Sequence, residues 1–494
     1  MTGSYAALRR KIVTIATSEE LWPFIWMGAA LLICRWIASL VLPVYDDAFI
    51  TFRYSRNLAT RNGFVYHPGE WVLGTTTPGF GLLVSLFYVL GLPMPQTVVV
   101  MNIVLDAVVF CVTLCTVPKN ERQVFGAILG ALLAISPIMT RISVGGMEMD
   151  LYLVGCVLSI LLYLRQFKRS AVILAAICYF LRPEALVLLG LLCAIEWFSG
   201  KRSNAFRLGL FASMVLAVPS ILIFSFYGQV LPQSVIAKSD LAKPLLLDML
   251  RQLLAPDPLI ALLILPATWG FVVSVRRAGF SKIVGMWSVI YLATYIVARP
   301  KIWSWYGEPI YYAIVLLATL GGIDLIARWS RLRQAFALKW SCPLIAGLCV
   351  AVWMFVWVRL GPSAVTRQVY EPLKAWCRDN TRENTSILAY DIGVIGYYSN
   401  ARIYDLAGLV WPAALSSTET DVIQTYWPDY LFLNATQSTV KLMGSAPFNK
   451  LYQPVAQFSR ANLPVWGASV EHYPADWVQD YIMFRKQSVE HRQD

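Results

Sequence analysis

Long apolar stretches separated by short polar connections dominate the first 359 residues of the chain. A helix needs about 20 mostly apolar residues to cross the hydrocarbon core of a bilayer. Eleven stretches are candidate spans, near residues 22–44, 97–117, 124–141, 150–164, 170–181, 184–197, 205–227, 257–275, 282–298, 309–327 and 341–359. The pattern therefore predicts a polytopic α-helical membrane protein with about 11 transmembrane helices.

Three apolar stretches are too short to cross a bilayer alone. Two of them flank Arg182-Pro183-Glu184, so we expect them to meet inside the protein, where a broken helix is tolerated. The third, residues 79–92, is predicted to lie as a helix on the outer surface. With that assignment, the basic clusters of the chain all fall on one side of the membrane.

The basic clusters set the predicted orientation, because Lys and Arg accumulate in cytoplasmic connections. The N-terminus is then cytoplasmic and the C-terminus is extracytoplasmic. The first apolar run is too long for the core of a signal peptide and lacks a small-residue cleavage pattern, so it is interpreted as a retained helix.

Composition agrees with this class of protein. Hydrophobic residues make up 57% of the chain and charged residues only 14%, whereas about a quarter of residues are charged in soluble domains. The net charge of +12 does not indicate a nucleic-acid partner, because acidic residues slightly outnumber basic ones after residue 359. Most of the nine cysteines lie in apolar spans, so no disulfide framework is expected.

Residues 360–494 have the composition of a globular domain, and residues 1–359 are assigned to a transmembrane domain with an outer loop at 45–78. Alternating apolar residues predict strands at 386–390, 402–405 and 429–434, with a turn at 391–396. Val369, Leu373 and Trp376 recur at helical spacing and predict a helix over 366–379. We expect a small extracytoplasmic α/β domain.

Two adjacent carboxylates, Asp46 and Asp47, end the first apolar run. Such charges are costly near lipid and indicate either chemistry at the membrane surface or the capping of a helix. One of them is a candidate base that takes a proton from a hydroxyl acceptor. Arg53 and Arg56 share a helical face and are expected to clamp a phosphate or to form structural ion pairs. His67 is a candidate ligand contact, or a solvated loop residue.

Further candidates follow along the chain. Glu148, Arg182 and Glu184 are charges in apolar surroundings, which are either functional or ion-paired. Lys238 and Lys301 are basic residues on the predicted outer side, where a phosphate would explain them. Trp303, Trp305 and Tyr306 form an interfacial aromatic belt or stack against a bound ligand. Asp391 is a turn residue or an acceptor contact.

The order of these blocks resembles a known family. The resemblance rests on the Asp46-Asp47-Ala48 motif followed by Phe52-Arg53-Tyr54, and on further blocks at 62–66, 68–70, 146–148, 181–184, 227–232, 305–306, 390–398 and 405–409. They are similar to the GT-C superfamily of membrane glycosyltransferases, with the closest likeness to the mycobacterial terminal arabinofuranosyltransferases and their bacterial relatives. The chain departs from that family at Thr75-Thr76-Thr77-Pro78 and in its shorter tail.

The resemblance implies a multi-pass enzyme of the bacterial inner (plasma) membrane. It would transfer a sugar, first of all arabinofuranose, from a polyprenyl-phosphate donor to a cell-envelope glycan or glycoprotein on the extracytoplasmic face. Asp46 and Asp47 would be catalytic. The residues from Arg53 to Tyr306 named above would bind the donor, and Asp391 would lie on the acceptor side. No cofactor is implied with certainty, and a divalent cation stays open.

Three alternatives remain at this level, and one of them is an assembly or scaffold protein that retains the fold without activity, which would leave the intact acidic pair unexplained. The same fold would serve a polyprenyl-phosphate mannose or hexose transferase. A lipid-linked sugar transporter or flippase is the alternative from a different class, but a transporter is expected to show paired repeats with corresponding broken helices. The sequence shows one broken helix and no internal repeat.

Overall fold

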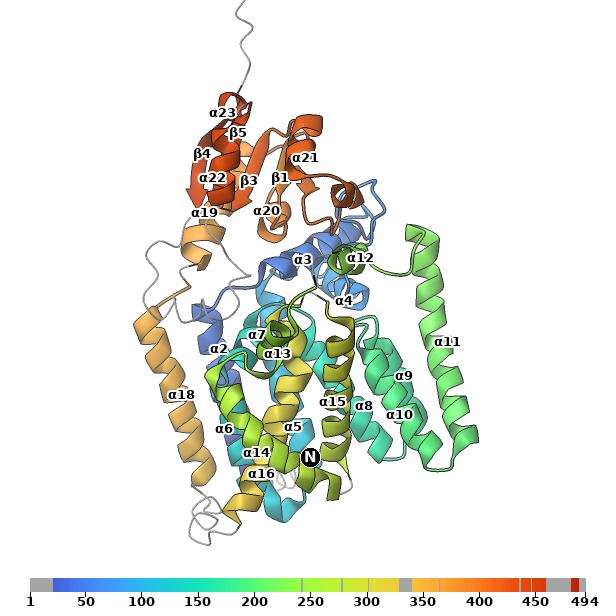
Figure 1. Cartoon of the computed structure of the whole chain (residues 1–494). Helices are drawn as coiled ribbons and strands as arrows, with labels where there is room; N and C mark the ends of the chain where they lie inside the picture. Colours follow the sequence, from blue (N-terminus) through green and yellow to red (C-terminus); the bar gives the residue numbers. More distant parts are fainter. Residues whose placement is uncertain are drawn as a thin grey trace, which may run out of the picture.

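A bundle of long helices carries a smaller domain built around a β-sheet at one end (Figure 1). The computed structural model describes residues 21–240, 243–276, 279–300, 302–327, 340–363, 365–434, 437–445, 447–458 and 481–487. Within these residues the fold class expected from the sequence is confirmed. The protein is a polytopic helical membrane protein with a small C-terminal α/β domain.

Each of the eleven predicted spans is helical. The helices are α2 (Gly28–Val41, continuing η2, Pro23–Met27), α5 (Gln96–Cys115), α6 (Arg122–Ile135, after η3, Lys119–Glu121), α8 (Met149–Leu164), α9 (Lys168–Cys178), α10 (Ala185–Phe198), α11 (Arg202–Tyr227), α14 (Pro258–Arg276), α15 (Phe280–Ala298), α16 (Glu308–Ile326) and α18 (Ser341–Leu360). Among the described residues, seven helical stretches are long and apolar enough to cross a membrane alone, or up to eight if a bent pair counts as one span.

The bent pair corrects one predicted span. The sequence predicts a single helix at 124–141, but α6 stops at Ile135 and α7 (Pro137–Val144) leaves it at an angle of 68°. Ser136 caps α7 through a hydrogen bond from the Met139 amide (3.4 Å), and Pro137 takes the first helical position. Proline has no amide hydrogen and disfavours helix at the residue before it, so the break falls there.

The break predicted at Arg182-Pro183-Glu184 is present, because α9 ends at Cys178 and α10 begins at Ala185. The surface helix predicted at 79–92 is also present as α4 (Pro78–Val89). It lies with α3 (Asp46–Ala59) and α12 (Gln233–Asp240) between the bundle and the sheet domain (Figure 1). The helices α13 (Leu246–Leu254) and η4 (Ser304–Gly307) pack against each other and against α16.

The described part of the C-terminal domain contains a mixed five-stranded sheet of order β2-β1-β3-β5-β4. Its strands are β1 (Ser386–Ala389), β2 (Arg402–Asp405), β3 (Tyr430–Asn434), β4 (Tyr452–Phe458) and β5 (Tyr481–Lys486). β1 pairs in parallel with β2 and β3, and β5 is antiparallel to β3 and β4. The three predicted strands are therefore confirmed, and the sequence reasoning missed β4 and β5.

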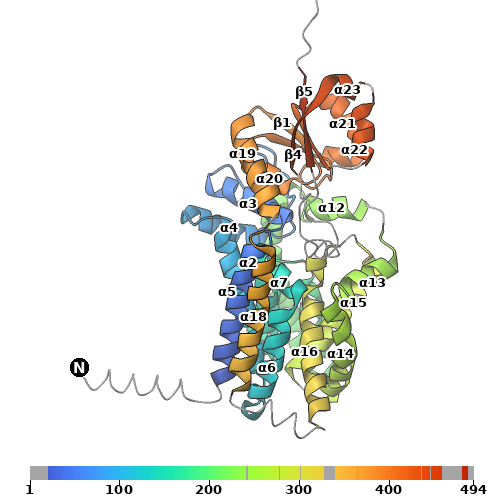
Figure 2. The same ribbon diagram turned by 90° about the vertical axis from the view of Figure 1, so that its left-hand side faces the viewer.

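Helices cover the sheet and join it to the bundle (Figure 2). They are η5 (Thr366–Tyr370), α19 (Glu371–Asn380), α20 (Gly393–Tyr398), η6 (Pro412–Ser416), α21 (Glu419–Tyr426), α22 (Gln437–Gly444) and α23 (Phe448–Leu451). The helix predicted at 366–379 corresponds to η5 and α19. The turn predicted at 391–396 is wrong in part, because helix α20 begins at Gly393, where its first amides are held by a side chain from another part of the chain.

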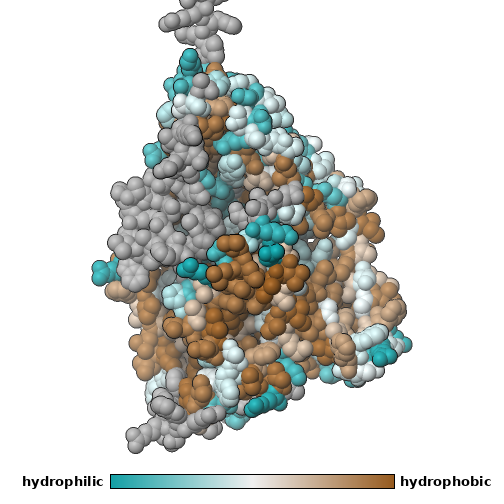
Figure 3. Space-filling view, viewed as in Figure 1, coloured by the Kyte–Doolittle hydropathy of each residue, from teal (hydrophilic) through white to brown (hydrophobic). Residues whose placement is uncertain are grey.

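The hydropathy of the visible surface differs between the helical bundle and the C-terminal domain (Figure 3). Apolar residues cover the sides of the bundle, and polar residues gather on the C-terminal domain and at the opposite end of the bundle. Lipid-facing helices are expected to look like this, because apolar surface stays in contact with the hydrocarbon.

Candidate functional site

A small polar cavity of about 40 Å³ lies between the helical bundle and the C-terminal domain. Its walls come from α3, the segment after it, the loop before α8, the turn between α9 and α10, α12 and η4. The residues that give it polar character are Asp47, Thr51, Thr75, Thr76, Thr77, Glu148, Arg182, Ser234, Lys238 and Tyr306. Segments far apart in the sequence therefore meet at one site.

Asp47 faces this cavity from the first turn of α3. Within the described residues no hydrogen bond to its carboxylate is found, and its side chain is half-buried. Burial raises the pKa of Asp47 above its usual value, and the positive charge of Lys238 opposes that rise. A carboxylate whose pKa moves toward neutrality, and whose oxygens are not already occupied, is suited to accept a proton.

Lys238 lines the same cavity and supplies a positive charge. Its ammonium donates a hydrogen bond to the Tyr306 hydroxyl (3.0 Å) and lies 4.6 Å from the centre of the Trp303 ring. The nearby Tyr306 and Asp47 raise the pKa of Lys238 although its burial lowers it, so the side chain stays charged. The aromatic residues Trp303, Trp305 and Tyr306 stack on one another beside it.

Arg182 is already paired. It donates to Glu148 (2.9 Å) and to Glu184 (2.7 Å), and Tyr295 donates to the same Glu184 oxygen (2.5 Å). The guanidinium also lies 4.2 Å from the centre of the Tyr306 ring. Of the two readings that the sequence left open, the structure shows ion pairing, which fixes the turn between α9 and α10 against the cavity.

Asp46 points away from the cavity, unlike its neighbour. Its two carboxylate oxygens accept hydrogen bonds from the backbone amides of Gly393 and Val394, both at 2.8 Å. Burial and the nearby Asp391 raise the pKa of Asp46 to about 8, while the two amide donors oppose the rise. Both oxygens are thus engaged by the C-terminal domain.

Arg53, Arg56 and His67 also turn to the C-terminal domain instead of the cavity. Arg53 donates to the carbonyls of Gly396 (2.7 Å) and Ala401 (3.1 Å), and Arg56 donates to the carbonyl of Tyr397 (2.8 Å). His67 lies between Arg53 and the Ile403 carbonyl, 3.0 Å from its Nε2. Burial and Arg53 lower the pKa of His67 to about 3, so its imidazole is neutral.

Asp391 lies at the same junction, close enough to Asp46 to raise its pKa, and accepts a hydrogen bond from Tyr481 (2.8 Å). Lys301 lies outside the described residues.

Sequence reasoning missed the hydroxyl groups of Thr51, Thr75, Thr77 and Ser234 in the cavity. The Gly74-Thr75-Thr76-Thr77-Pro78 run is a polar signal between apolar segments that points to them. Among the described residues, no three His, Cys, Asp or Glu side chains are grouped to hold a metal ion.

Comparison of the chain with solved structures identifies its fold. The chain is similar to ArnT from Cupriavidus metallidurans in the apo state, with a TM-score of 0.60 at 10% identity, over 94% of this chain and 97% of that one. It is also similar to the same protein bound to undecaprenyl phosphate, with a TM-score of 0.57 at 11% identity, over 94% and 98% of the two chains. ArnT is a GT-C glycosyltransferase, and the chain has the GT-C fold.

The sequence comparisons add one family. Residues 363–481, within the C-terminal domain, match a family model described as "Domain of unknown function (DUF8728)". No curated protein matches the chain.

Proposed function

We propose that the protein transfers a sugar from a polyprenyl-phosphate donor to a hydroxyl of an acceptor in the cell envelope. The observation that carries the proposal is the polar cavity, which is lined by both the Asp47 carboxylate and the Lys238 ammonium, close enough for the lysine charge to act on the pKa of Asp47. The GT-C fold, and the undecaprenyl phosphate bound to ArnT, make a polyprenyl-linked donor the first to test.

We infer a direct displacement, with Asp47 as the base. The acceptor oxygen forms a bond to the anomeric carbon of the sugar, and its proton passes to Asp47. The bond between that carbon and the phosphate oxygen breaks, and its electron pair leaves with the polyprenyl phosphate. Lys238 compensates the charge that develops on the leaving phosphate, as a cation placed at a leaving group does in a site shielded from water.

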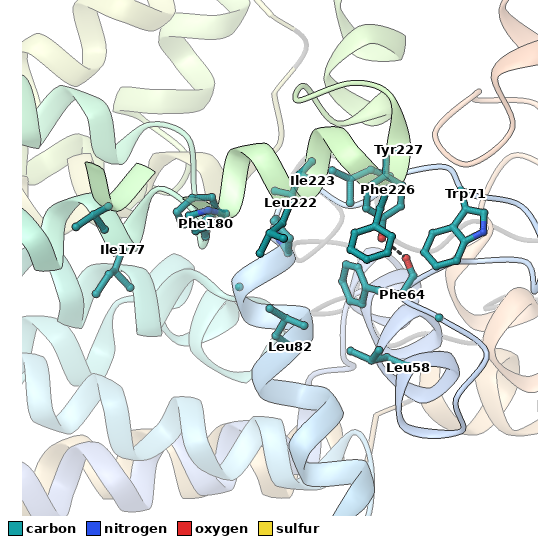
Figure 4. Close-up of a pocket in the computed structure, with 16 residues that line it drawn as sticks. Leu58, Phe64, Trp71, Leu82, Ile177, Phe180, Leu222, Ile223, Phe226 and Tyr227 are labelled. Carbon is teal, nitrogen blue, oxygen red and sulfur yellow. Dashed lines mark hydrogen bonds between the residues drawn. The ribbon is translucent and has the colours of Figure 1, made fainter. Parts of the chain in front are cut away.

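An apolar cavity lies close to the polar one and supports a lipid-linked donor. It has a volume of about 540 Å³, and side chains of the loop after α3, of α4, α9 and α11 line it (Figure 4). The segment 73–79 separates the two cavities, because Leu73, Pro78 and Gly79 line the apolar one and residues 74–77 line the polar one. An amphiphile with a phosphate head and an isoprenoid chain matches this division.

The finer assignment is arabinofuranose as the sugar, which rests on the motifs shared with the arabinofuranosyltransferases, with mannose or another hexose as the alternative. The acceptor is a glycan or a glycoprotein. A flippase is distinguished from a transferase by its product. Purified protein in detergent with donor and acceptor should form a new glycosidic bond, which a transporter would not make.

Filling the apolar cavity should weaken binding of long-chain donors selectively. Ile223 lines the cavity on α11, and a Trp in its place would occupy part of the space proposed for the isoprenoid. Each excluded methylene costs about 0.8 kcal/mol, so excluding two corresponds to roughly tenfold in affinity. We expect Ile223→Trp to bind undecaprenyl phosphate roughly tenfold more weakly while its affinity for geranyl phosphate is unchanged.

Leu210→Trp is the matched control, because Leu210 is exposed on the same helix and does not line the cavity. Titration of both phosphates against the purified variants is the measurement. Equal affinity of wild type and Ile223→Trp for the long-chain phosphate would place the lipid elsewhere.

The orientation is proposed from the distribution of basic residues, which puts the C-terminal domain outside the bacterial inner membrane. A single cysteine at position 166, between α8 and α9, should then be protected from an impermeant thiol reagent in intact cells. A cysteine at Ser417, which is exposed in the C-terminal domain, should react. Both labels are read in a background without the nine native cysteines. Reaction at position 166 in intact cells would reverse the proposed topology.

A further inference from the structure

The two adjacent carboxylates at the start of α3 have different surroundings. Asp47 faces the polar cavity, whereas Asp46 accepts the first amides of α20 in the C-terminal domain. Because both residues belong to one helical turn, whatever holds Asp46 also fixes the direction of Asp47. The role of the C-terminal domain can therefore be sought at this contact.

Further hydrogen bonds hold the same two surfaces together. Side chains of α3 and the loop after it bind backbone carbonyls of the C-terminal domain: Arg53 binds Gly396 and Ala401, Arg56 binds Tyr397, Tyr66 binds Ile392 (2.6 Å), and His67 lies against Ile403 (3.0 Å). In return, Tyr370 donates to the Val44 carbonyl (3.1 Å). We call this set of contacts, together with Asp46, the joint.

The joint requires close backbone approach. A Cβ atom at Gly393 would lie 1.8 Å from the Asp46 carbonyl oxygen, and one at Gly396 would lie 1.7 Å from the Tyr66 hydroxyl. Real side chains are not found at such separations. These glycines therefore allow α20 to lie directly on α3, and any larger residue would have to push the two surfaces apart.

A second part of the C-terminal domain reaches the cavity itself. Asp405 accepts the amides of Ala407 (2.9 Å) and Val410 (2.8 Å), which shapes the loop after β2. Leu409 of this loop lines the polar cavity, and the Gly408 carbonyl accepts a hydrogen bond from Gln233 (3.2 Å). Gln233 starts α12, the helix that carries Lys238.

We propose that the C-terminal domain is an integral part of the catalytic site and that Asp46 is a positioning residue, which fastens this domain to α3 and so aims Asp47 into the cavity. The inference rests on the proposed function of Asp47. It gives the C-terminal domain a role in catalysis, because this domain contacts both α3, which carries the proposed base, and α12, which carries the proposed phosphate-binding cation.

Opening the joint should reduce turnover without removing any group from the cavity. We expect Gly393→Ala and Asp46→Asn to lower kcat by about a hundredfold, since a displacement of about 1 Å at a reacting group has effects of that size. Donor affinity measured with undecaprenyl phosphate should change much less. Gly444→Ala is the matched control, because it lies in the same domain with open space around it.

Hydrogen exchange of the full-length protein separates positioning from general unfolding. In Gly393→Ala and Asp46→Asn, amide exchange should rise in α3 and α20 and stay unchanged in α14 and α16. Asp47→Asn should leave exchange in α3 and α20 as in wild type while it lowers the rate of transfer by about 10²- to 10⁴-fold.

Each outcome decides between the two proposals. The positioning role of the joint is refuted if both Gly393→Ala and Asp46→Asn keep the wild-type kcat, or if both leave amide exchange in α3 unchanged. This conclusion holds even if Asp47→Asn is inactive. If Asp47→Asn transfers normally while the two joint variants show raised exchange, the assigned base is rejected and the contact of the two domains stands.

Discussion

Replacing Asp47 by Asn is expected to lower the rate of sugar transfer by about 10²- to 10⁴-fold, the usual contribution of a general base. Asn has nearly the same shape, but its amide cannot take up the proton of the acceptor hydroxyl. The Asp47 carboxylate has no competing hydrogen bond among the described residues, so the substitution disrupts little else. Donor affinity should be kept or slightly increased, because a negative charge facing Lys238 and the donor phosphate is removed.

The measurement is single-turnover transfer with purified protein and saturating polyprenyl-phosphate sugar. Asp248→Asn is the control, since it makes the same chemical change at an exposed residue of α13, away from the cavity. The wild-type rate should rise with pH as Asp47 ionises, at a pH above the usual range for Asp because burial raises this pKa. Transfer by Asp47→Asn at the wild-type rate would exclude Asp47 as the base.

Replacing Lys238 by Met is expected to weaken donor binding roughly ten- to hundredfold, because a hydrogen bond to a charged group contributes about 1.5 to 3 kcal/mol. Met keeps most of the apolar stem that packs beside Trp303 and removes the charge. Acceptor affinity should hardly change. Arg182 is unable to replace the missing cation, because Glu148 and Glu184 already neutralise it.

Titration of the polyprenyl-phosphate sugar against the variant in nanodiscs measures this effect. Lys243→Met, at an exposed position a few residues further on, removes the same charge outside the cavity. Unaltered donor affinity in Lys238→Met would show that the phosphate binds elsewhere. Lys301, which the sequence also nominates, is then the next residue to test.

The fold class was largely predictable because membrane helices depend on local composition. A stretch of apolar residues in lipid has to satisfy its backbone hydrogen bonds internally. Each predicted span is therefore helical whichever helices pack against it. The bend at Pro137 and the strands β4 and β5 were not predicted. The bend is a local effect of proline within an apolar run, whereas β4 and β5 pair with each other and β5 with β3 across a long stretch of chain.

The candidate site was predictable as a set of residues but not as a set of roles. Sequence reasoning brought forward six residues that the structure gathers around one cavity: Asp47, Glu148, Arg182, Lys238, Trp305 and Tyr306. It also brought forward Arg53, Arg56 and His67 on the same grounds, and their side chains bind the C-terminal domain. Charge in an apolar setting signals that a partner is needed, but it does not say whether that partner is a substrate or a backbone carbonyl.

The sequence by itself determined that this is a membrane protein with an acidic pair at the end of its first span and a globular tail. Only the tertiary structure separated the pair, since Asp46 and Asp47 are equivalent in composition and spacing. Neighbouring side chains on a helix point about 100° apart, so one carboxylate reaches the amides of Gly393 and Val394 while the other faces the cavity. That division depends on a domain more than 300 residues further along the chain, which no local pattern encodes.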